Sequence, residues 1–155
     1  MVSRLFSGKT SLSRRFVTGH FESDYLSTIG VDVYRKDMKI GDKSIVFQIW
    51  DLGGQEKYET VRRNFYKGAT GAILIFDVLR PKTFEKLTYW MEEMKHNAGS
   101  IPFVLCGNKI DLKGRKISKK RAEQFAKKVG APYFETSAKT GESVRPAFIW
   151  IGQQD

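Results

Sequence analysis

The sequence predicts an α/β fold whose sheet is mostly parallel, with one antiparallel edge strand. Helical and strand-like patterns alternate along the 155 residues, which is typical of parallel strands joined by helices. The exception is Gly41-Asp42, a hairpin turn signal between two strand-like runs, which makes one strand antiparallel to its neighbour. No repeat or linker divides the chain, and its length fits one domain, so we expect residues 1–155 to form a single unit.

Local patterns place the elements along the chain. In order, we expect a helix over 9–17, a polar loop over 21–28, strands over 31–40 and 44–50, a strand over 69–78, a helix from 81, a helix between 118 and 130, a short strand from 133 and a last helix from 144 to the end. The helix from 81 begins with a proline, which suits a first turn. Its apolar residues recur at helical spacing and are expected to face the core: Phe84, Leu87, Met91 and Met94. Ser118 is a suitable N-cap for the next helix, and Gly130 a suitable end.

The chain carries 27 basic and 17 acidic residues, a net charge of +10. This charge permits attraction to anionic membranes or nucleic acid. The densest basic cluster is interpreted as a solvated loop and helix start: Lys113, Arg115, Lys116, Lys119, Lys120 and Arg121. No aromatic residues are interleaved with it as a base-stacking platform, and no groove-reading motif is visible, so no nucleic-acid partner is expected.

Cysteine usage and hydropathy favour a cytoplasmic protein. The single cysteine, Cys106, lies in an apolar run, which predicts a small buried side chain and excludes an internal disulfide. No apolar stretch approaches the ~18 residues of a membrane span. The N-terminal stretch is too short for a signal peptide, and the C-terminus carries no cysteine for prenylation. Peripheral membrane contact stays open, without a lipidation site.

A polar loop that follows the apolar run 101–106 reads Asn108-Lys109-Ile110-Asp111, and Ser137-Ala138-Lys139 comes later. A buried strand that ends in a polar loop is where open α/β sheets bind ligands. One carboxylate, Asp111, can accept two hydrogen bonds, from a ring N–H and an exocyclic amine. Guanine presents that pair on one edge and adenine does not. An asparagine can donate and accept, and a lysine stem can lie flat on a base. The loop therefore indicates guanine recognition.

The segment Gly8-Lys9-Thr10 at a helix start is the second half of a phosphate-binding loop. Gly8 lets the backbone approach phosphates, and Lys9 is expected to reach the β- and γ-phosphates. The Thr10 hydroxyl is expected to bind Mg²⁺, and the helix N-terminus adds partial positive charge. The first glycine of the full pattern is replaced by Ser3, and two bulky residues, Leu5 and Phe6, stand inside the loop.

Four further residues suit nucleotide hydrolysis. Asp51 follows an apolar strand, where a carboxylate can hold Mg²⁺ through water, and Gly54 can give its N–H to a γ-phosphate. The Gln55 amide has one acceptor and two donors, which is enough to orient an attacking water. Thr28 can ligate Mg²⁺ when a γ-phosphate is present. Catalysis is then expected from Gln55 together with Lys9 and the metal.

Together these motifs resemble the Ras-like small GTPases, and the Rab branch in particular. The segments that carry the resemblance are Gly8-Lys9-Thr10-Ser11-Leu12, Ser27-Thr28-Ile29-Gly30-Val31-Asp32, Trp50-Asp51-Leu52-Gly53-Gly54-Gln55-Glu56, Phe65-Tyr66-Lys67-Gly68-Ala69, Asn108-Lys109-Ile110-Asp111 and Glu135-Thr136-Ser137-Ala138-Lys139. The resemblance implies a P-loop NTPase G domain with helices on both faces of the sheet. It also implies a switch in trafficking or signalling that binds GTP and GDP with Mg²⁺, and that hydrolyses GTP slowly without an activating protein.

The resemblance also assigns the nucleotide site. Nucleotide ligands would be Ser7, Gly8, Lys9, Thr10, Ser11, Phe21, Thr28, Gly54, Asn108, Lys109, Asp111, Ser137, Ala138 and Lys139, and the metal ligands would be Thr10, Thr28 and Asp51. Phe21 would pack edge-on against the guanine, Lys109 and Lys139 would cover its faces, and the Ala138 N–H would bind its carbonyl. Two switch segments, 21–33 and 52–65, would present effector, exchange-factor and activating proteins with a surface that depends on the nucleotide. The protein is expected to be monomeric.

This chain departs from the family in three places. Leu52-Gly53 replaces the Thr-Ala usual in Rab proteins, and Val33 stands where they carry phenylalanine. Family members have a strand before the phosphate loop near the centre of the sheet. Only seven residues precede Gly8, so we expect that strand to be absent or reduced. Because of this and of Ser3, Leu5 and Phe6, the alternative is a catalytically impaired G-domain scaffold that binds nucleotide weakly.

Overall fold

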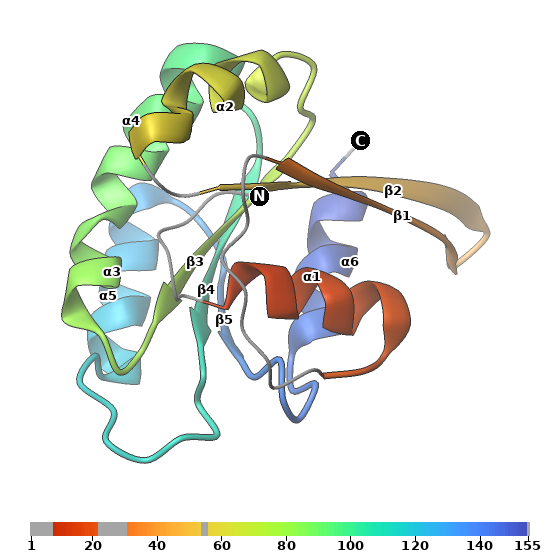
Figure 1. Ribbon diagram of the computed structural model, residues 1–155. Helices are drawn as coiled ribbons and strands as arrows, with labels where there is room; N and C mark the ends of the chain where they lie inside the picture. Colours follow the sequence, from red (N-terminus) through yellow and green to blue (C-terminus); the bar gives the residue numbers. More distant parts are fainter. Residues whose placement is uncertain (1–7, 22–30, 54–55, 155) are drawn as a thin grey trace.

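The computed structural model describes residues 8–21, 31–53 and 56–154. Their elements are, in chain order, α1 (Lys9–Thr18), β1 (Val31–Ile40), β2 (Lys43–Leu52), the 3₁₀ turn η1 (Glu56–Tyr58), α2 (Glu59–Tyr66), β3 (Ala72–Asp77), α3 (Pro81–Glu85), α4 (Leu87–Ala98), β4 (Phe103–Asn108), α5 (Lys119–Val129), β5 (Tyr133–Thr136) and α6 (Val144–Gly152). Strands and helices alternate after the hairpin, as the sequence predicts (Figure 1).

The strands form two groups within the described residues. β3, β4 and β5 are parallel neighbours in that order, and β1 and β2 form an antiparallel hairpin around Gly41-Asp42. The α/β fold and the antiparallel hairpin are therefore confirmed, although the antiparallel element is a pair of strands. The strand expected before the phosphate loop falls on residues 1–7, outside the described part of the chain. A cavity of about 330 Å³ lies between β2 and β3, with Phe148 and Ile151 of α6 among its lining residues.

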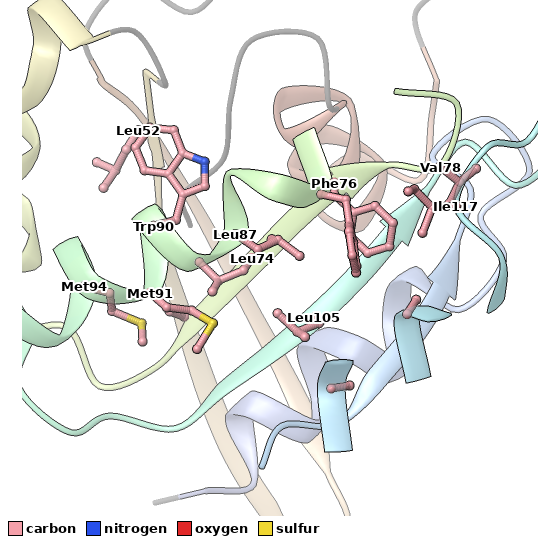
Figure 2. Close-up of a cluster of buried hydrophobic side chains, with 14 of the residues drawn as sticks. Leu52, Leu74, Phe76, Val78, Leu87, Trp90, Met91, Met94, Leu105 and Ile117 are labelled. Atoms are coloured by element: carbon pink, nitrogen blue, oxygen red, sulfur yellow. The ribbon is translucent and has the colours of Figure 1, made fainter. Parts of the chain in front are cut away.

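The three parallel strands are covered on both faces, because alternate side chains of β3 enter different clusters. Leu74 and Phe76 point toward α3, α4 and α5, where Leu87 and Trp90 pack against them (Figure 2). The intervening residues, Ile73 and Ile75, belong to a second cluster with α1 and α6. All six residues of β3 are buried, which matches the continuous apolar run expected of a strand covered on both sides.

The hairpin joins the parallel strands through both clusters. Phe47 and Ile49 of β2 contact the α1–α6 side, where the Phe47 ring meets Phe16 edge-on at 5.2 Å between centroids. Leu52, at the end of β2, is 2% exposed in the other cluster. β2 runs two residues beyond the predicted end at Trp50, so Asp51 lies within the strand. This extension places the Asp51 carboxylate beside α1.

The helix boundaries follow their capping residues. The Ser118 hydroxyl accepts a hydrogen bond from the Arg121 N–H, and Gly130 ends α5 in the left-handed conformation. The apolar residues of the helix expected from residue 81 are buried as predicted, but the segment forms two helices and not one. It is divided at Lys86 into the short α3 and the longer α4. No helix in the described ranges is both long and apolar enough to cross a membrane.

Candidate functional site

The parallel strands end in a row of polar residues. In the strand register, Asp77 of β3 pairs with Asn108 of β4, and Asn108 pairs with Thr136 of β5. All three are at most 1% exposed. The carboxyl edge of a parallel sheet is the usual ligand-binding edge of an open α/β fold. The polar loops that follow β4 and β5 therefore begin side by side at this edge.

The two loops predicted to bind the base are held together by direct hydrogen bonds. The Ser137 hydroxyl donates to Asp111 Oδ1 at 2.7 Å, and the Thr136 hydroxyl donates to Asn108 Oδ1 at 3.2 Å. The Ile110 N–H also donates to the Thr136 carbonyl. The carboxylate that would read guanine is thus oriented by a side chain from the other loop, and it stays solvent-accessible.

Lys109 adopts a left-handed backbone conformation, with φ of 70°, and its side chain contacts β3. Its ammonium lies 2.8 Å from Asp77 Oδ2, and Asp77 Oδ1 accepts a hydrogen bond from the Leu79 N–H. The buried carboxylate therefore holds both the base-loop lysine and the turn after β3. The sequence analysis missed Asp77, whose only signal is its place at the end of a buried strand.

Arg15 of α1 braces the second base loop from the other side. Its guanidinium donates to the Lys139 carbonyl at 3.3 Å and to the Thr140 carbonyl at 3.2 Å. Gly141 has φ of +84°, and a Cβ there would lie 2.7 Å from the Arg15 Nη2. A side chain at Gly141 would therefore push the guanidinium off the loop. The two carbonyls belong to the segment after Ser137-Ala138. The helix α1 therefore contacts the loop predicted to bind the base and also begins at the segment predicted to bind phosphate.

Gly8 brings the phosphate segment against the base loop. It adopts φ of 86° at the N-terminus of α1, and a Cβ there would lie 2.2 Å from the Asn108 Nδ2. Only glycine fits this approach, because L-residues rarely adopt this conformation and the space is filled. The sequence predicted that Gly8 lets a phosphate approach the backbone. The structure adds a close approach of Gly8 to the Asn108 side chain, which no sequence signal indicates.

Lys9, Thr10 and Asp51 meet in a buried cluster at the start of α1. The Thr10 hydroxyl donates to Asp51 Oδ2 at 2.5 Å, and the Lys9 ammonium lies 3.3 Å from Asp51 Oδ1. Lys9 is 6% exposed, Thr10 9% and Asp51 0%. The structure therefore brings together one cation and two oxygen-bearing side chains that the sequence assigned to phosphate and Mg²⁺.

The other predicted site residues divide into two groups. Ser11 lies in α1, Phe21 is 38% exposed after the end of α1, Ala138 is buried and Lys139 is exposed. Ser7, Thr28, Gly54 and Gln55 lie outside the described residues, as do Ser3, Leu5, Phe6 and most of the switch segment 21–33. Cys106 is buried within β4, and burial raises the pKa of its thiol to about 12, as expected of a structural side chain.

A second buried polar cluster adjoins the switch segment 52–65 and was not predicted. Arg62 of α2 is 0% exposed and donates to the Gly53 carbonyl at 2.9 Å. It also makes a bidentate pair with Glu93 of α4, at 2.9 Å from Nη2 to Oε1, and stacks over the Trp90 ring. The Tyr66 hydroxyl donates to Glu93 at 3.0 Å. An arginine in a polar helix resembles a surface residue in the sequence, so this role had no visible signal.

The donor set fits a phosphate-bound magnesium ion. Magnesium prefers oxygen ligands and usually takes only one or two protein carboxylates together with phosphate oxygens and water. Thr10 and Asp51 supply a hydroxyl and a carboxylate next to each other, and Lys9 supplies a cation for phosphate. Within the described ranges no three His, Cys, Asp or Glu side chains cluster as a protein-only metal site. The residues present therefore suit a metal held partly by its nucleotide.

Comparison with known proteins identifies the family. The Ras family matches over residues 1–154. The Ras-related protein Rab7 of Drosophila melanogaster is 40% identical over 152 residues, which cover 94% of this chain and 73% of that protein. Rab-13 of Bos taurus is 41% identical over 143 residues, covering 91% and 70% of the two chains. The GTP-binding protein YPTC5 of Chlamydomonas reinhardtii is 41% identical over 153 residues, covering 93% and 74%. These matches show that the chain belongs to the Ras family, as a Rab-like member of the Ras superfamily.

Proposed function

We propose that this protein is a GTP-binding molecular switch that binds GTP and GDP with Mg²⁺ and hydrolyses GTP. The observation that carries the proposal is the orientation of Asp111 by the Ser137 hydroxyl at 2.7 Å, beside Asn108. A carboxylate fixed in this way can accept two hydrogen bonds from one edge of guanine. Adenine places a single donor and an acceptor there, so the same carboxylate would lose one bond and face a lone pair. The site therefore favours guanine over adenine.

The base would lie between the stems of Lys109 and Lys139, with Phe21 at its edge. The Asp77 carboxylate keeps Lys109 in position, and Arg15 keeps the loop of Lys139 in position. The Ala138 N–H would bind the guanine carbonyl. These contacts select the base and orient the nucleotide, so that its phosphates extend toward Gly8 and the N-terminus of α1.

At the phosphate end, Lys9 would leave Asp51 for the β- and γ-phosphates, and the backbone N–H groups of Gly8 and Ser11 would add donors. Thr10, Thr28 and Asp51 would hold Mg²⁺, directly or through water. The bound ion would supply charge neutralisation at the phosphates. Gln55 would orient the attacking water, Gly54 would donate its N–H to the γ-phosphate, and Lys9 would stabilise the charge that develops during transfer.

The switch segments 21–33 and 52–65 would change with the bound nucleotide and present effectors, exchange factors and activating proteins with different surfaces. The names of the Rab relatives favour a role in trafficking. We place the protein in the cytoplasm as a monomer, with peripheral contact at membranes. No arginine of this chain is assigned to the γ-phosphate, so an activating partner would supply one, an effect worth ~10³–10⁵ in rate.

Titration calorimetry with GDP and with ATP, each in Mg²⁺, tests the base assignment. GDP should bind and ATP should not, while equal binding would refute guanine selection. Asp111→Asn is the sharpest variant, because an amide can donate to the second carbonyl of xanthine. It should lose GDP binding and gain binding of xanthosine diphosphate.

Phosphate release from GTP by wild type and Gln55→Leu tests the hydrolytic role, and equal rates would refute it. The alternative of an impaired scaffold rests on Ser3, Leu5 and Phe6 in the phosphate loop. Tight retention of GDP by the purified protein would exclude that alternative, and absence of nucleotide binding would favour it.

A further inference from the structure

The positive charge of this protein is concentrated in one short segment. Residues 113–128 contain eight basic residues and one acidic residue, Glu123, so this segment accounts for seven of the ten net positive charges of the chain. The basic residues are Lys113, Arg115, Lys116, Lys119, Lys120, Arg121, Lys127 and Lys128. The remaining residues are close to neutral overall. A charge imbalance of this size over one helix and its preceding loop creates a positive electrostatic potential that is concentrated at this part of the surface.

The fold places these charges on the outside of α5. The helix buries Ala122 and Ala126 and packs the half-buried Phe125 and Val129 against the same cluster, while its charged residues are exposed. The six lysines of the segment are all exposed, and we name them the lysine face: Lys113, Lys116, Lys119, Lys120, Lys127 and Lys128. Within the lysine face, Lys119 makes a loose, exposed ion pair with Glu123, at 3.9 Å from Nζ to Oε1.

The two arginines of the segment are already engaged within the protein. Arg115 makes a bidentate pair with Glu135, at 2.7 Å from Nη2 to Oε2, and donates to the Ile117 carbonyl at 2.6 Å. The Arg121 guanidinium lies 5.0 Å from the centre of the Phe84 ring. The surface therefore presents ammonium groups, which are mobile point charges, and not the guanidinium forks that recognise one phosphate or base edge.

We propose that the lysine face binds anionic lipid membranes. A fluid surface of negative headgroups matches several separate ammonium groups on a convex helix, and each such lysine adds about 1 kcal/mol near the surface. Leu112, which is 46% exposed, adjoins Lys113 and provides an apolar side chain at the edge of the face. The described face offers neither exposed aromatic rings for base stacking nor a groove, so the observations favour lipid over nucleic acid.

The position of the face suits attachment without covering the β1–β2 hairpin. α5 lies on the side of the sheet that α3 and α4 also cover, while the β1–β2 hairpin extends from the opposite side of the molecule (Figure 1). A membrane against α5 would leave β1 directed away from the lipid. The proposal does not depend on nucleotide binding, because none of the six lysines belongs to the nucleotide site.

Sedimentation with lipid vesicles tests the proposal with the full 155-residue chain. Vesicles that contain roughly one phosphatidylserine for every two phosphatidylcholine molecules should bind the protein at low salt. Vesicles of pure phosphatidylcholine should not bind it. Lys120→Gln/Lys127→Gln/Lys128→Gln should lower the partition coefficient by about 100-fold, at roughly fivefold per lysine. Leu112→Ser should lower it further in the same assay. Circular dichroism should show unchanged thermal unfolding for these surface variants.

The matched control removes the same charge elsewhere. Lys39→Gln/Lys43→Gln/Lys67→Gln changes three exposed lysines on the hairpin and after α2. This control should bind the anionic vesicles nearly as well as wild type. Equal losses in the two triple variants would show a general charge effect and overturn the proposal. Absence of vesicle binding would overturn it too, as would displacement of the protein from vesicles by an equal phosphate concentration of single-stranded or duplex nucleic acid.

Discussion

The substitution Glu93→Gln tests whether the buried cluster around Arg62 holds α2 against α4. It keeps the shape of the side chain and an oxygen acceptor for Tyr66, but it removes the negative charge. Arg62 would then remain 0% exposed with its guanidinium facing an amide. Its hydrogen bond to the Gly53 carbonyl and its stacking on Trp90 would not replace the lost charge.

The magnitude follows from the burial of both partners. Breaking one side of a buried ion pair costs about 3–5 kcal/mol, because it leaves an uncompensated charge away from water. For a domain of this size each kcal/mol lowers the midpoint of thermal unfolding by about 2–4 °C, so the expected fall is roughly 6–20 °C. Removing the charge from both partners with Arg62→Met/Glu93→Gln keeps an acceptor for the Tyr66 hydroxyl and should restore much of the loss.

Thermal and urea unfolding, followed by circular dichroism, measure this effect, and Glu92→Gln is the matched control. Glu92 precedes Glu93 in α4 but is exposed, so its variant should stay within about 0.5 kcal/mol of wild type. If Glu93→Gln were no less stable than Glu92→Gln, the buried pair would carry no net stability. If the double variant were as unstable as the single one, the loss would come from packing and not from charge.

Two further predictions concern the base loop and the response to alkali. Ser137→Ala removes the charge-assisted bond to Asp111 and should weaken GDP binding about 10- to 100-fold, with the exposed Ser44→Ala as control; unchanged calorimetric affinity would contradict the assigned orientation. Burial raises the pKa of Cys106 to about 12, and burial followed by Glu93 raises the pKa of Tyr66, so the folded state keeps protons that the unfolded state loses. These two groups should therefore leave the free energy of unfolding unchanged from neutral pH to about pH 8 and lower it above that, by up to about 1.4 kcal/mol per pH unit for each ionising group, and a flat urea-unfolding profile from pH 8 to pH 11 would be inconsistent with this.

Local patterns were sufficient to predict most of the fold. A strand was predicted over 69–78 around the apolar run 72–76, and the structure has β3 at Ala72–Asp77 with every residue buried. α5 is equally legible, since Ser118 and Gly130 mark its two ends and the buried residues fall between them. The division of α3 from α4 at Lys86 was not predicted, because Phe84 and Leu87 keep helical spacing across the break. The apolar pattern indicates which residues face the core, but not where one helix ends and the next begins.

The candidate site was predictable where chemistry depends on residue type, and less so where it depends on contact. Asn108 and Asp111 stand out because few residues can read a base edge. Asp77 and Arg62 do not stand out, since a carboxylate at a strand end and an arginine in a polar helix are common in any soluble protein. Their roles arise from distances, 2.8 Å to Lys109 and 2.9 Å to the Gly53 carbonyl, that join segments far apart in the sequence.

The two ends of the proposed nucleotide site differ in how far their groups are already arranged. At the base end, Asp111 is held by Ser137 and remains open to solvent, so guanine can bind without breaking that bond. At the phosphate end, the Lys9 ammonium balances the charge of the buried Asp51 carboxylate, and the Thr10 hydroxyl donates a hydrogen bond to it. A phosphate that draws Lys9 away removes an ammonium from this carboxylate, which is costly at 0% exposure unless another cation replaces it. Under the proposed function, the same buried contacts would couple phosphate binding to cation binding, and the base end would set specificity with little rearrangement.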